Sequence, residues 1–243
     1  MKKIDYNDII FIDNDEEIFN SGSYGIIKRC IIDDKVYAYK SFENSNYLNG
    51  KKRKLELLSD IEDKNLLLPK YWTKDKNDNI CYLAPYKKSK IIDYYDLDPI
   101  KTRLSILKQT KKVILKMHDY GIIHSDLYAG NILVNNDDTF IIDFDNCTFN
   151  KYKTNILDSN DYCQEFIKKY GICKELDIHM FNLLTYSFLN ELDYYKTRYN
   201  ILVNGIKFQD KESIKICNSL FLEDKYPNKD FLIDTIDETS FQM

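Results

Sequence analysis

The sequence is poor in the residues that interrupt regular structure: its 243 residues include only seven glycines and four prolines. No apolar run approaches the roughly 20 residues that a helix needs to cross a bilayer, so we expect no membrane span. No internal repeat and no linker rich in proline, glycine or serine divides the chain. A chain of this length can bury one core or form two small lobes, so we expect a single domain over residues 1–243.

Zinc-binding and disulfide-rich classes are also disfavoured by what is missing. The six cysteines form no C-x-x-C pair, and only three histidines are present as further ligands. Neither a zinc site nor a disulfide framework is therefore expected. Cysteines without a pairing pattern are typical of a reducing compartment. The N-terminus reaches Asp5 before any apolar stretch, unlike a secretory signal, so we expect a cytoplasmic protein.

The charge balance bears on the partners. The formal net charge of −4 argues against a general surface for nucleic acid or for an anionic membrane, so no nucleic-acid partner is expected. Basic residues do cluster in Lys51-Lys52-Arg53-Lys54. We interpret this cluster as the solvent-facing side of a helix, which is the usual position of such a run.

Apolar patterning divides the chain into two regions. The first, at about residues 8–86, contains one expected helix around residues 51–61. Its short apolar stretches predict strands at residues 9–12, 26–27 and 36–39. The second region, at about residues 87–243, is mostly helical in pattern. We therefore predict an α+β fold of two lobes: a small antiparallel β-rich N-lobe with one main helix, and a mostly helical C-lobe.

Three patterns stand out in the C-lobe. Leu104 and Leu107 begin a series of apolar residues at helical intervals, and Gly121 stands where that helix should stop. Apolar stretches on both sides of the polar residues 135–138 predict a hairpin. Residues 177–186 are apolar enough for a buried helix.

Two features of the N-lobe suit the binding of phosphate. Ser21-Gly22-Ser23-Tyr24-Gly25 lies between two apolar strands, where glycine lets backbone N–H groups approach phosphate oxygens. The same residues also suit an ordinary hairpin turn, and the sequence contains no Walker loop. Lys40 ends an apolar strand, where an ammonium group either extends to solvent or needs an anionic partner such as a nucleotide phosphate.

The strongest signal comes from the C-lobe. The stretch His124-Ser125-Asp126-Leu127-Tyr128-Ala129-Gly130-Asn131 is followed by Asp143-Phe144-Asp145 at the end of an apolar strand. A carboxylate at Asp126 can orient a substrate hydroxyl and accept its proton. Asn131 and Asp143 offer hard oxygen ligands suited to Mg²⁺ that bridges ATP phosphates. With Lys40, these residues supply the charged groups that phosphoryl transfer requires.

The ordered motifs resemble those of protein kinases. Gly22-Ser23-Tyr24-Gly25-Ile26-Ile27 resembles the end of the family's G-x-G-x-x-G-x-V loop, and Tyr37-Ala38-Tyr39-Lys40 resembles V-A-I-K. The stretch from His124 to Asn131 resembles the catalytic loop, and Asp143-Phe144-Asp145 resembles D-F-G. The resemblance covers about residues 19–190.

This resemblance implies a kinase fold and an enzyme that uses ATP and Mg²⁺ to phosphorylate a hydroxyl side chain of a protein, with Ser or Thr favoured. It implies that Asp126 and Lys40 are catalytic and that Asn131 and Asp143 bind the metal. It also implies ATP-binding residues in the glycine loop, the sheet and the connection between the lobes: Phe19, Gly22, Ser23, Tyr24, Gly25, Ile27, Ala38, Lys40, Pro85 and Lys87.

The resemblance further implies three structural residues. Asp177 begins a stretch similar to the family's buried central helix, whose Asp holds the backbone of the catalytic loop. Glu165 occupies the place of the Glu in A-P-E, and His124 is expected to brace the loop.

Three departures from the family pattern leave the acceptor open. Asp145 replaces the Gly of D-F-G and Gly130 precedes Asn131, as in aminoglycoside and choline phosphotransferases, so a small-molecule kinase is one alternative. Tyr128 replaces the Lys common in Ser/Thr-specific loops. A pseudokinase that acts as a binding module is a second alternative, although no catalytic role has lost its residue.

The partner of Lys40 is ambiguous at this level. In protein kinases a helical Glu pairs with this Lys, but counting back from Leu57-Leu58 places Lys54 at that position. The nearby carboxylate, Glu56, is two residues further on, which rotates it by about 200° around the helix. Either Glu56 pairs with Lys40 in a shifted register, or Lys40 pairs with Asp143 or with nucleotide alone.

Overall fold

The structure is a computed structural model, and its chain divides into two compact units. The first unit comprises Met1–Lys88 together with Ile142–Asp145, and the second comprises Ser89–Ile141 together with Asn146–Met243. The described residues are 1–12, 19–22, 25–42, 51–136, 138–152, 161–194, 197, 201, 208, 211–221 and 230–240.

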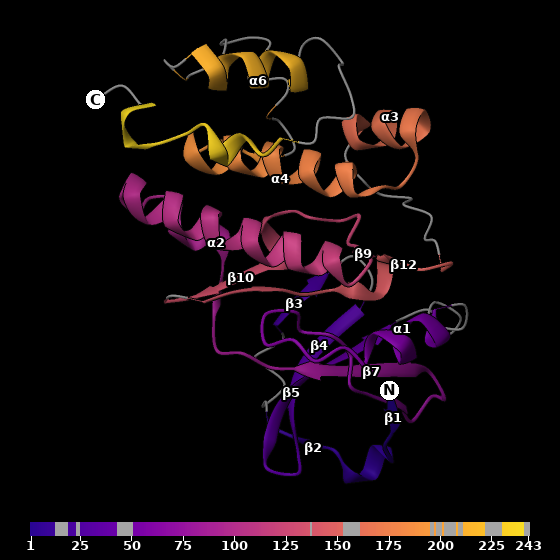
Figure 1. The fold of residues 1–243 in the computed structure, drawn as a ribbon. Coiled ribbons are helices and arrows are strands. Elements are labelled where there is room, and N and C mark those ends of the chain that lie inside the picture. Colours follow the sequence, from indigo (N-terminus) through magenta and orange to yellow (C-terminus); the bar gives the residue numbers. More distant parts are fainter. Residues whose placement is uncertain are drawn as a thin grey trace. The chain divides into compact units, whose positions relative to one another are not determined.

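The first unit is built on a β-sheet, in which β4, β5 and β7 run side by side (Figure 1). In the described part of the unit the strand order is β1-β6-β7-β5-β4-β2, and β3 also pairs with β4. The pairs are antiparallel except for β1 with β6. The strands are β1 (Lys2–Lys3), β2 (Ile10–Phe11), β3 (Phe19–Gly22), β4 (Gly25–Ile32), β5 (Lys35–Phe42), β6 (Tyr71–Lys74) and β7 (Ile80–Pro85).

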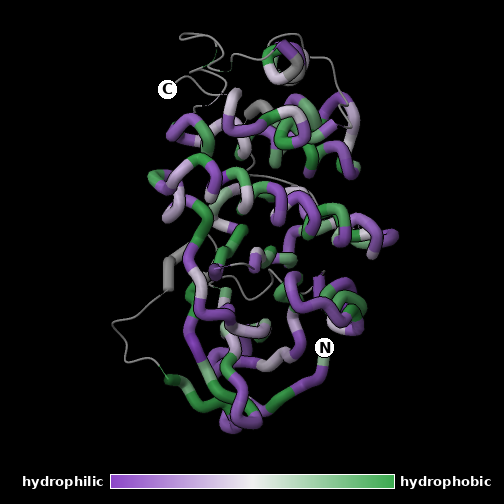
Figure 2. Tube along the Cα trace, turned by 60° about the vertical axis from the view of Figure 1, so that its left-hand side comes forward, coloured by the Kyte–Doolittle hydropathy of each residue, from purple (hydrophilic) through white to green (hydrophobic). Residues whose placement is uncertain are grey.

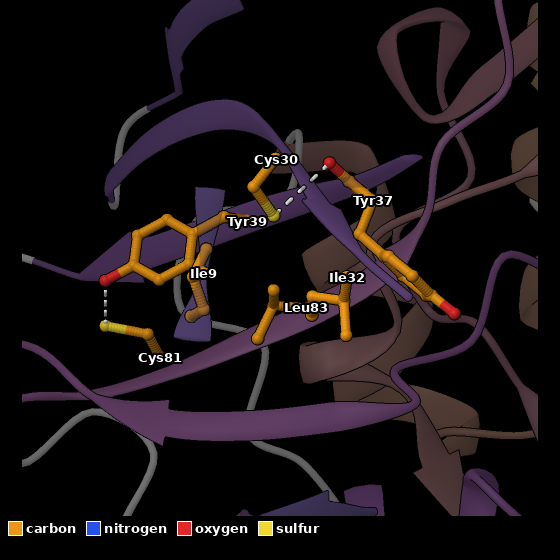
Figure 3. Packing of buried hydrophobic residues seen from close by; sticks show 7 residues of the cluster. All are labelled: Ile9, Cys30, Ile32, Tyr37, Tyr39, Cys81 and Leu83. Atoms are coloured by element: carbon orange, nitrogen blue, oxygen red, sulfur yellow. Dashed lines mark hydrogen bonds between the residues drawn. The ribbon is translucent and has the colours of Figure 1, made fainter. Parts of the chain in front are cut away.

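One face of this sheet carries an apolar core. Alternate residues of β4, β5 and β7 point into it, as expected for strands with one buried face. Tyr39 donates a hydrogen bond from its hydroxyl to the Cys81 sulfur at 2.9 Å, so the buried phenol keeps a polar partner (Figure 3). The cluster drawn in Figure 3 consists of Ile9, Cys30, Ile32, Tyr37, Tyr39, Cys81 and Leu83.

A helix, α1 (Lys52–Leu58), completes the first unit, together with the 3₁₀ turn η1 (Tyr6–Asp8). The inner face of α1 is buried through Leu55 and Leu58, which are fully inaccessible to solvent. Burying an aliphatic side chain of this size contributes about 1.5–3 kcal/mol, which is what holds so short a helix in place. The predicted helix is therefore confirmed, as are the strands predicted in this region.

The second unit is mostly helical. Its helices α2 (Ile100–Asp119) and α4 (Lys174–Leu189) lie side by side (Figure 1). Figure 2 shows hydrophobic and hydrophilic residues interspersed along the helices of this unit, as expected of helices with a buried face. The remaining helices are α3 (Asp161–Tyr170) and α6 (Lys211–Phe221), with the 3₁₀ turns η2 (Ile92–Tyr95), η3 (Ala129–Asn131), η4 (Phe144–Asn146), η6 (Leu232–Asp234) and η7 (Glu238–Ser240).

Short strands frame the segment between α2 and α3. The predicted hairpin is present as β10 (Ile132–Asn135) and β11 (Asp138–Ile141), paired antiparallel. The other strands are β8 (Lys90–Ile91), which pairs with β10, and β9 (Ile122–Ile123), which pairs with β12 (Thr148–Phe149).

The turn between α2 and β9 confirms the predicted helix stop. Gly121 has φ +76°, a left-handed conformation that favours glycine, and its N–H donates to the carbonyl of His118 at 3.0 Å. The α+β fold predicted from the sequence is thus confirmed. None of the helices in the described ranges is both long and apolar enough to cross a membrane.

Candidate active site

The predicted site residues fall into two groups, one in each unit. In the first unit, the Lys40 ammonium on β5 lies 2.5 Å from Oδ1 of Asp143 and 3.3 Å from Oδ1 of Asp145. Tyr82, which stands opposite Lys40 on β7, donates from its hydroxyl to the same Asp143 oxygen at 3.3 Å. Lys40 and Asp143, which are 103 positions apart, are therefore brought together by the fold.

Burial and charge set the protonation of this group. Burial alone would lower the pKa of Lys40, but the carboxylates of Asp145 and then Asp143 outweigh it and raise the pKa. Burial raises the pKa of Asp143, the Asp145 carboxylate raises it further, and Lys40 lowers it in part. Two carboxylates thus compete for one lysine, which stays protonated.

The solvent-facing interpretation of the basic run in α1 is wrong for Lys54. Lys54 is only 3% exposed, and its ammonium donates to the main-chain carbonyl of Asp145 at 2.9 Å. The Lys51 ammonium lies 4.0 Å from Oδ2 of Asp145. Burial lowers the pKa of Lys51 to about 8, against the opposing effect of Asp145.

A signal for this arrangement was present in the sequence. Lys51, Lys54, Leu55 and Leu58 are spaced i, i+3, i+4 and i+7, so they share one face of a helix. Because that face is the buried one, Lys54 points inward with the leucines, whereas Lys51, at the N-cap, is partly exposed. A run of four basic residues goes round a whole helical turn and cannot lie entirely in solvent on a packed helix.

Glu56 is not the partner of Lys40 in the structure. Its carboxylate accepts from Arg53 at 3.2 Å on the outer side of α1, as expected from the rotation between positions 54 and 56. Lys40 instead has the two aspartates. This is the alternative in which Lys40 pairs with Asp143. Asp145 is an additional partner that the motifs did not predict.

The sheet places other predicted ATP-binding residues near Lys40. Ile27 stands opposite Lys40 between β4 and β5, and Ala38 stands opposite Ala84 between β5 and β7. Ile27, Ala38 and Lys40 therefore share the face opposite to the apolar core, because side chains alternate along a strand. That face is suited to receive a flat, partly apolar ligand.

The glycine loop is only partly described. Gly22 pairs with Gly25 where β3 turns into β4, and Phe19 pairs with Ile27. Ser23 and Tyr24 lie outside the described residues. Neither of these two paired glycines has a Cβ atom, so a phosphate can approach the backbone closely at both positions.

The connection after the sheet begins with two of the predicted residues. Pro85 ends β7 and stands opposite Tyr37. Lys87 follows and is exposed. Their predicted contact with adenine stays a prediction.

In the second unit, Asp177 holds the segment that precedes Asp126. Its fully buried carboxylate accepts from the backbone N–H groups of His124 at 2.8 Å and Ser125 at 2.7 Å, and contacts His118 Nε2 at 2.9 Å. Ser125 has φ +67°, a conformation that costs free energy for a residue with a Cβ. The two backbone bonds to Asp177 stabilise this strained turn, in keeping with the supporting role expected for Asp177.

Asn131 fixes the other end of the loop. Its amide nitrogen donates to the main-chain carbonyl of Asp126 at 2.9 Å and to Oδ2 of Asp126 at 3.2 Å. Because the amide nitrogen makes both of these hydrogen bonds, the amide oxygen of Asn131 is the atom that could coordinate a cation. An amide oxygen is among the hard oxygen ligands that Mg²⁺ accepts, and so is a carboxylate such as that of Asp143 in the first unit.

The second unit also contains one predicted residue, Glu165, and two that were not predicted as site residues, Cys163 and Tyr194. Glu165 lies on the exposed side of α3, and its supporting role stays a prediction. Cys163 on the same helix is fully buried, and its pKa is raised to about 12 by burial and next by the Asp126 carboxylate. Tyr194 donates to the carbonyl of Leu127 at 3.5 Å. No local motif marks Cys163 or Tyr194, because both reach the loop from distant parts of the chain.

Gly130 leaves space for the ring of Tyr128. A Cβ at position 130 would lie 2.6 Å from Cε2 of Tyr128 and 3.0 Å from Cζ. We expect Gly130→Ala to displace this ring and to lower the melting temperature by about 2–4 °C, because an overpacked site costs on the order of 1 kcal/mol.

The matched control for Gly130→Ala is the same change in a Tyr128→Ala background, where the clash is absent. In thermal unfolding of the four proteins, Gly130→Ala should lower the melting temperature when Tyr128 is present and should leave it unchanged when residue 128 is alanine. An equal loss in both backgrounds would contradict the steric explanation.

Comparison with known proteins gives two findings. A family described as "Protein kinase domain" matches residues 14–238. The "Probable bifunctional tRNA threonylcarbamoyladenosine biosynthesis protein" of Methanosphaera stadtmanae is similar to this chain, at 27% identity over 158 residues, or 65% of this chain and 29% of that protein. The chain thus spans less than a third of the length of this curated relative.

Proposed function

We propose that this chain, a phosphotransferase that belongs to the protein kinase family, transfers the γ-phosphoryl group of ATP to a hydroxyl group of a protein in the presence of Mg²⁺. A Ser or Thr side chain is the favoured acceptor. The observation that carries the proposal is the ion pair of Lys40 with Asp143. It joins a cation suited to phosphate with a carboxylate suited to a hard metal ion.

The residues divide the chemistry between them. Lys40 binds phosphate oxygens. Asn131 and Asp143 would each supply an oxygen ligand to Mg²⁺, whose charge would offset that of the phosphates. Asp126 orients the acceptor hydroxyl. As the hydroxyl oxygen bonds to the γ-phosphorus, its proton passes to Asp126 and the bond to the β-phosphate oxygen breaks, releasing ADP.

The sheet face described above supports the proposed binding of a nucleotide. Ile27 and Ala38 lie on the same face as Lys40, so a nucleotide whose phosphates contact Lys40 would place its adenine towards the end of β5 nearer Val36. There the backbone after Ala84 would present main-chain carbonyls near the base, whereas the Tyr86 N–H already donates to the Val36 carbonyl at 3.1 Å. Gly22 and Gly25 approach the phosphates.

A second candidate is phosphorylation of an acceptor that is not a protein. Asp145 and Gly130 favour it through their likeness to small-molecule phosphotransferases. The curated relative is named for tRNA modification, which also points away from a protein acceptor. Against a small molecule, only a short segment separates Lys87 from the start of α2 at Ile100. Such enzymes usually insert a substrate-binding helical region there.

The acceptor can be tested with γ-labelled ATP and Mg²⁺, using Asp126→Asn protein as the blank. We expect label to appear in protein when the wild type is incubated with a protein extract. Parallel reactions contain a panel of small alcohols or tRNA. Label only in small molecules or only in RNA would overturn the protein acceptor and support the second candidate. No label and no ATP consumption in any reaction would overturn both and support a binding module.

A further inference from the structure

Lys40 has two carboxylate partners that differ in their surroundings. The side chain of Asp143 is 32% exposed, whereas that of Asp145 is 2% exposed. In the proposed reaction Asp143 would serve as a ligand for Mg²⁺, and a carboxylate with that task would not be the dedicated partner of the lysine. Asp145 is too deeply buried to share a solvated metal ion and stays beside Lys40.

Asp145 is itself held by α1. Lys54 donates to its main-chain carbonyl at 2.9 Å, and the Lys51 ammonium lies 4.0 Å from its Oδ2. Leu55 and Leu58 anchor the same face of α1 in the core of the first unit. The position of Asp145 therefore depends on the position of α1.

The charges are exchanged relative to the arrangement that protein kinases use. There the helix supplies a Glu to the lysine of the sheet. Here the helix supplies a cation, Lys54, at the corresponding place, and the carboxylate comes from the end of Asp143-Phe144-Asp145. The buried lysines and aspartates compensate one another, as buried charges require.

We propose that Asp145 is the positioning residue for Lys40, and that Lys54 holds Asp145 in place by binding its main-chain carbonyl. This inference rests on the proposed function, because positioning Lys40 matters through the phosphates that it binds. It assigns to Lys54 and Asp145 together the task of the missing helical Glu, and it makes α1 part of the active machinery.

Activity provides the first test. Asp145→Asn keeps the shape of the side chain but removes its charge, and Lys54→Met removes the bond to the carbonyl. Each should lower kcat/KM for ATP by about a hundredfold, since a displaced phosphate-binding group loses its alignment. Glu56→Gln is the matched control on the same helix and should stay within about twofold. Equal, small effects of all three changes would overturn the proposal.

Restoring the usual charge arrangement gives a more specific test. Asp145→Gly and Lys54→Glu should each be as harmful as the changes above, because the first removes the carboxylate and the second places a negative charge beside Asp145. Their combination recreates a helical Glu next to a D-F-G sequence. We expect it to recover at least about tenfold of the lost activity. Losses that simply multiply in the combined variant would contradict a shared role.

A measurement that does not depend on turnover separates this inference from the proposed function. Unfolding of Lys40→Met, Asp145→Asn and the double variant forms a double-mutant cycle. The shifts in melting temperature should be non-additive by about 2–4 °C, as for side chains in contact. The same cycle with Glu56→Gln should be additive. If Lys40 and Asp145 are additive, the inference fails; if they are coupled but the wild type consumes no ATP, only the proposed function fails.

Discussion

Replacing Asp126 with asparagine should reduce phosphoryl transfer by roughly 10²–10⁴-fold, the usual contribution of a general base. Asparagine has nearly the same shape and can still accept the hydrogen bond that Asn131 donates to Asp126 Oδ2. It cannot take the proton of the acceptor hydroxyl. The loss should therefore appear in kcat with the melting temperature almost unchanged.

Asp119→Asn provides the matched control for this prediction. Asp119 is an exposed carboxylate at the end of α2 in the same unit, and its replacement should leave the rate within about twofold. Mg²⁺-dependent ATP turnover of the three proteins gives the comparison. Equal rates for wild type and Asp126→Asn would remove Asp126 from the chemistry and favour a protein that binds without catalysis.

Replacing Asp177 with alanine should have the largest effect on stability, a loss of about 3–5 kcal/mol. The carboxylate is fully buried and binds the backbone N–H groups of His124 and Ser125 and the ring of His118. Removing it leaves those donors buried without partners, each at a cost of about 1–3 kcal/mol. For a chain of this size the melting temperature should fall by about 10 °C.

Thermal unfolding and ATP turnover below the melting temperature test this together. Because Asp177 stabilises the left-handed turn at Ser125, the folded variant should also lose activity. Glu175→Ala, in the first turn of the same helix, is the control and should cost no more than about 1 kcal/mol. A loss for Asp177→Ala no larger than that of the control would contradict the supporting role.

The catalytic loop shows what local sequence can predict. Asp126 and Asn131 are five positions apart, and the bonds between them form within one turn of chain. The glycine stop at Gly121 and the hairpin of β10 and β11 are likewise local, so their conformations follow from nearby residues. For such features the identity and spacing of the residues are sufficient.

Lys54 and Asp145 show what the local sequence could not predict. Counting residues placed Lys54 at the position of the usual helical Glu, but could not say which group its ammonium meets. That group is a main-chain carbonyl 91 positions away. A long lysine side chain can extend to solvent or to a buried acceptor. Which of the two its ammonium group reaches depends on the residues that pack against the helix.

The amino-acid sequence by itself determined the α+β fold class, the family motifs and the choice of Asp126, Asn131, Asp143 and Lys40 as candidates. The periodic spacing of apolar residues and the short spacing between polar residues can be read directly from the amino-acid sequence. Only the tertiary structure decided that the partners of Lys40 are Asp143 and Asp145, and that Glu56 faces outward to Arg53. Ion pairs form between groups that folding brings within a few ångströms, and that proximity is a property of packing.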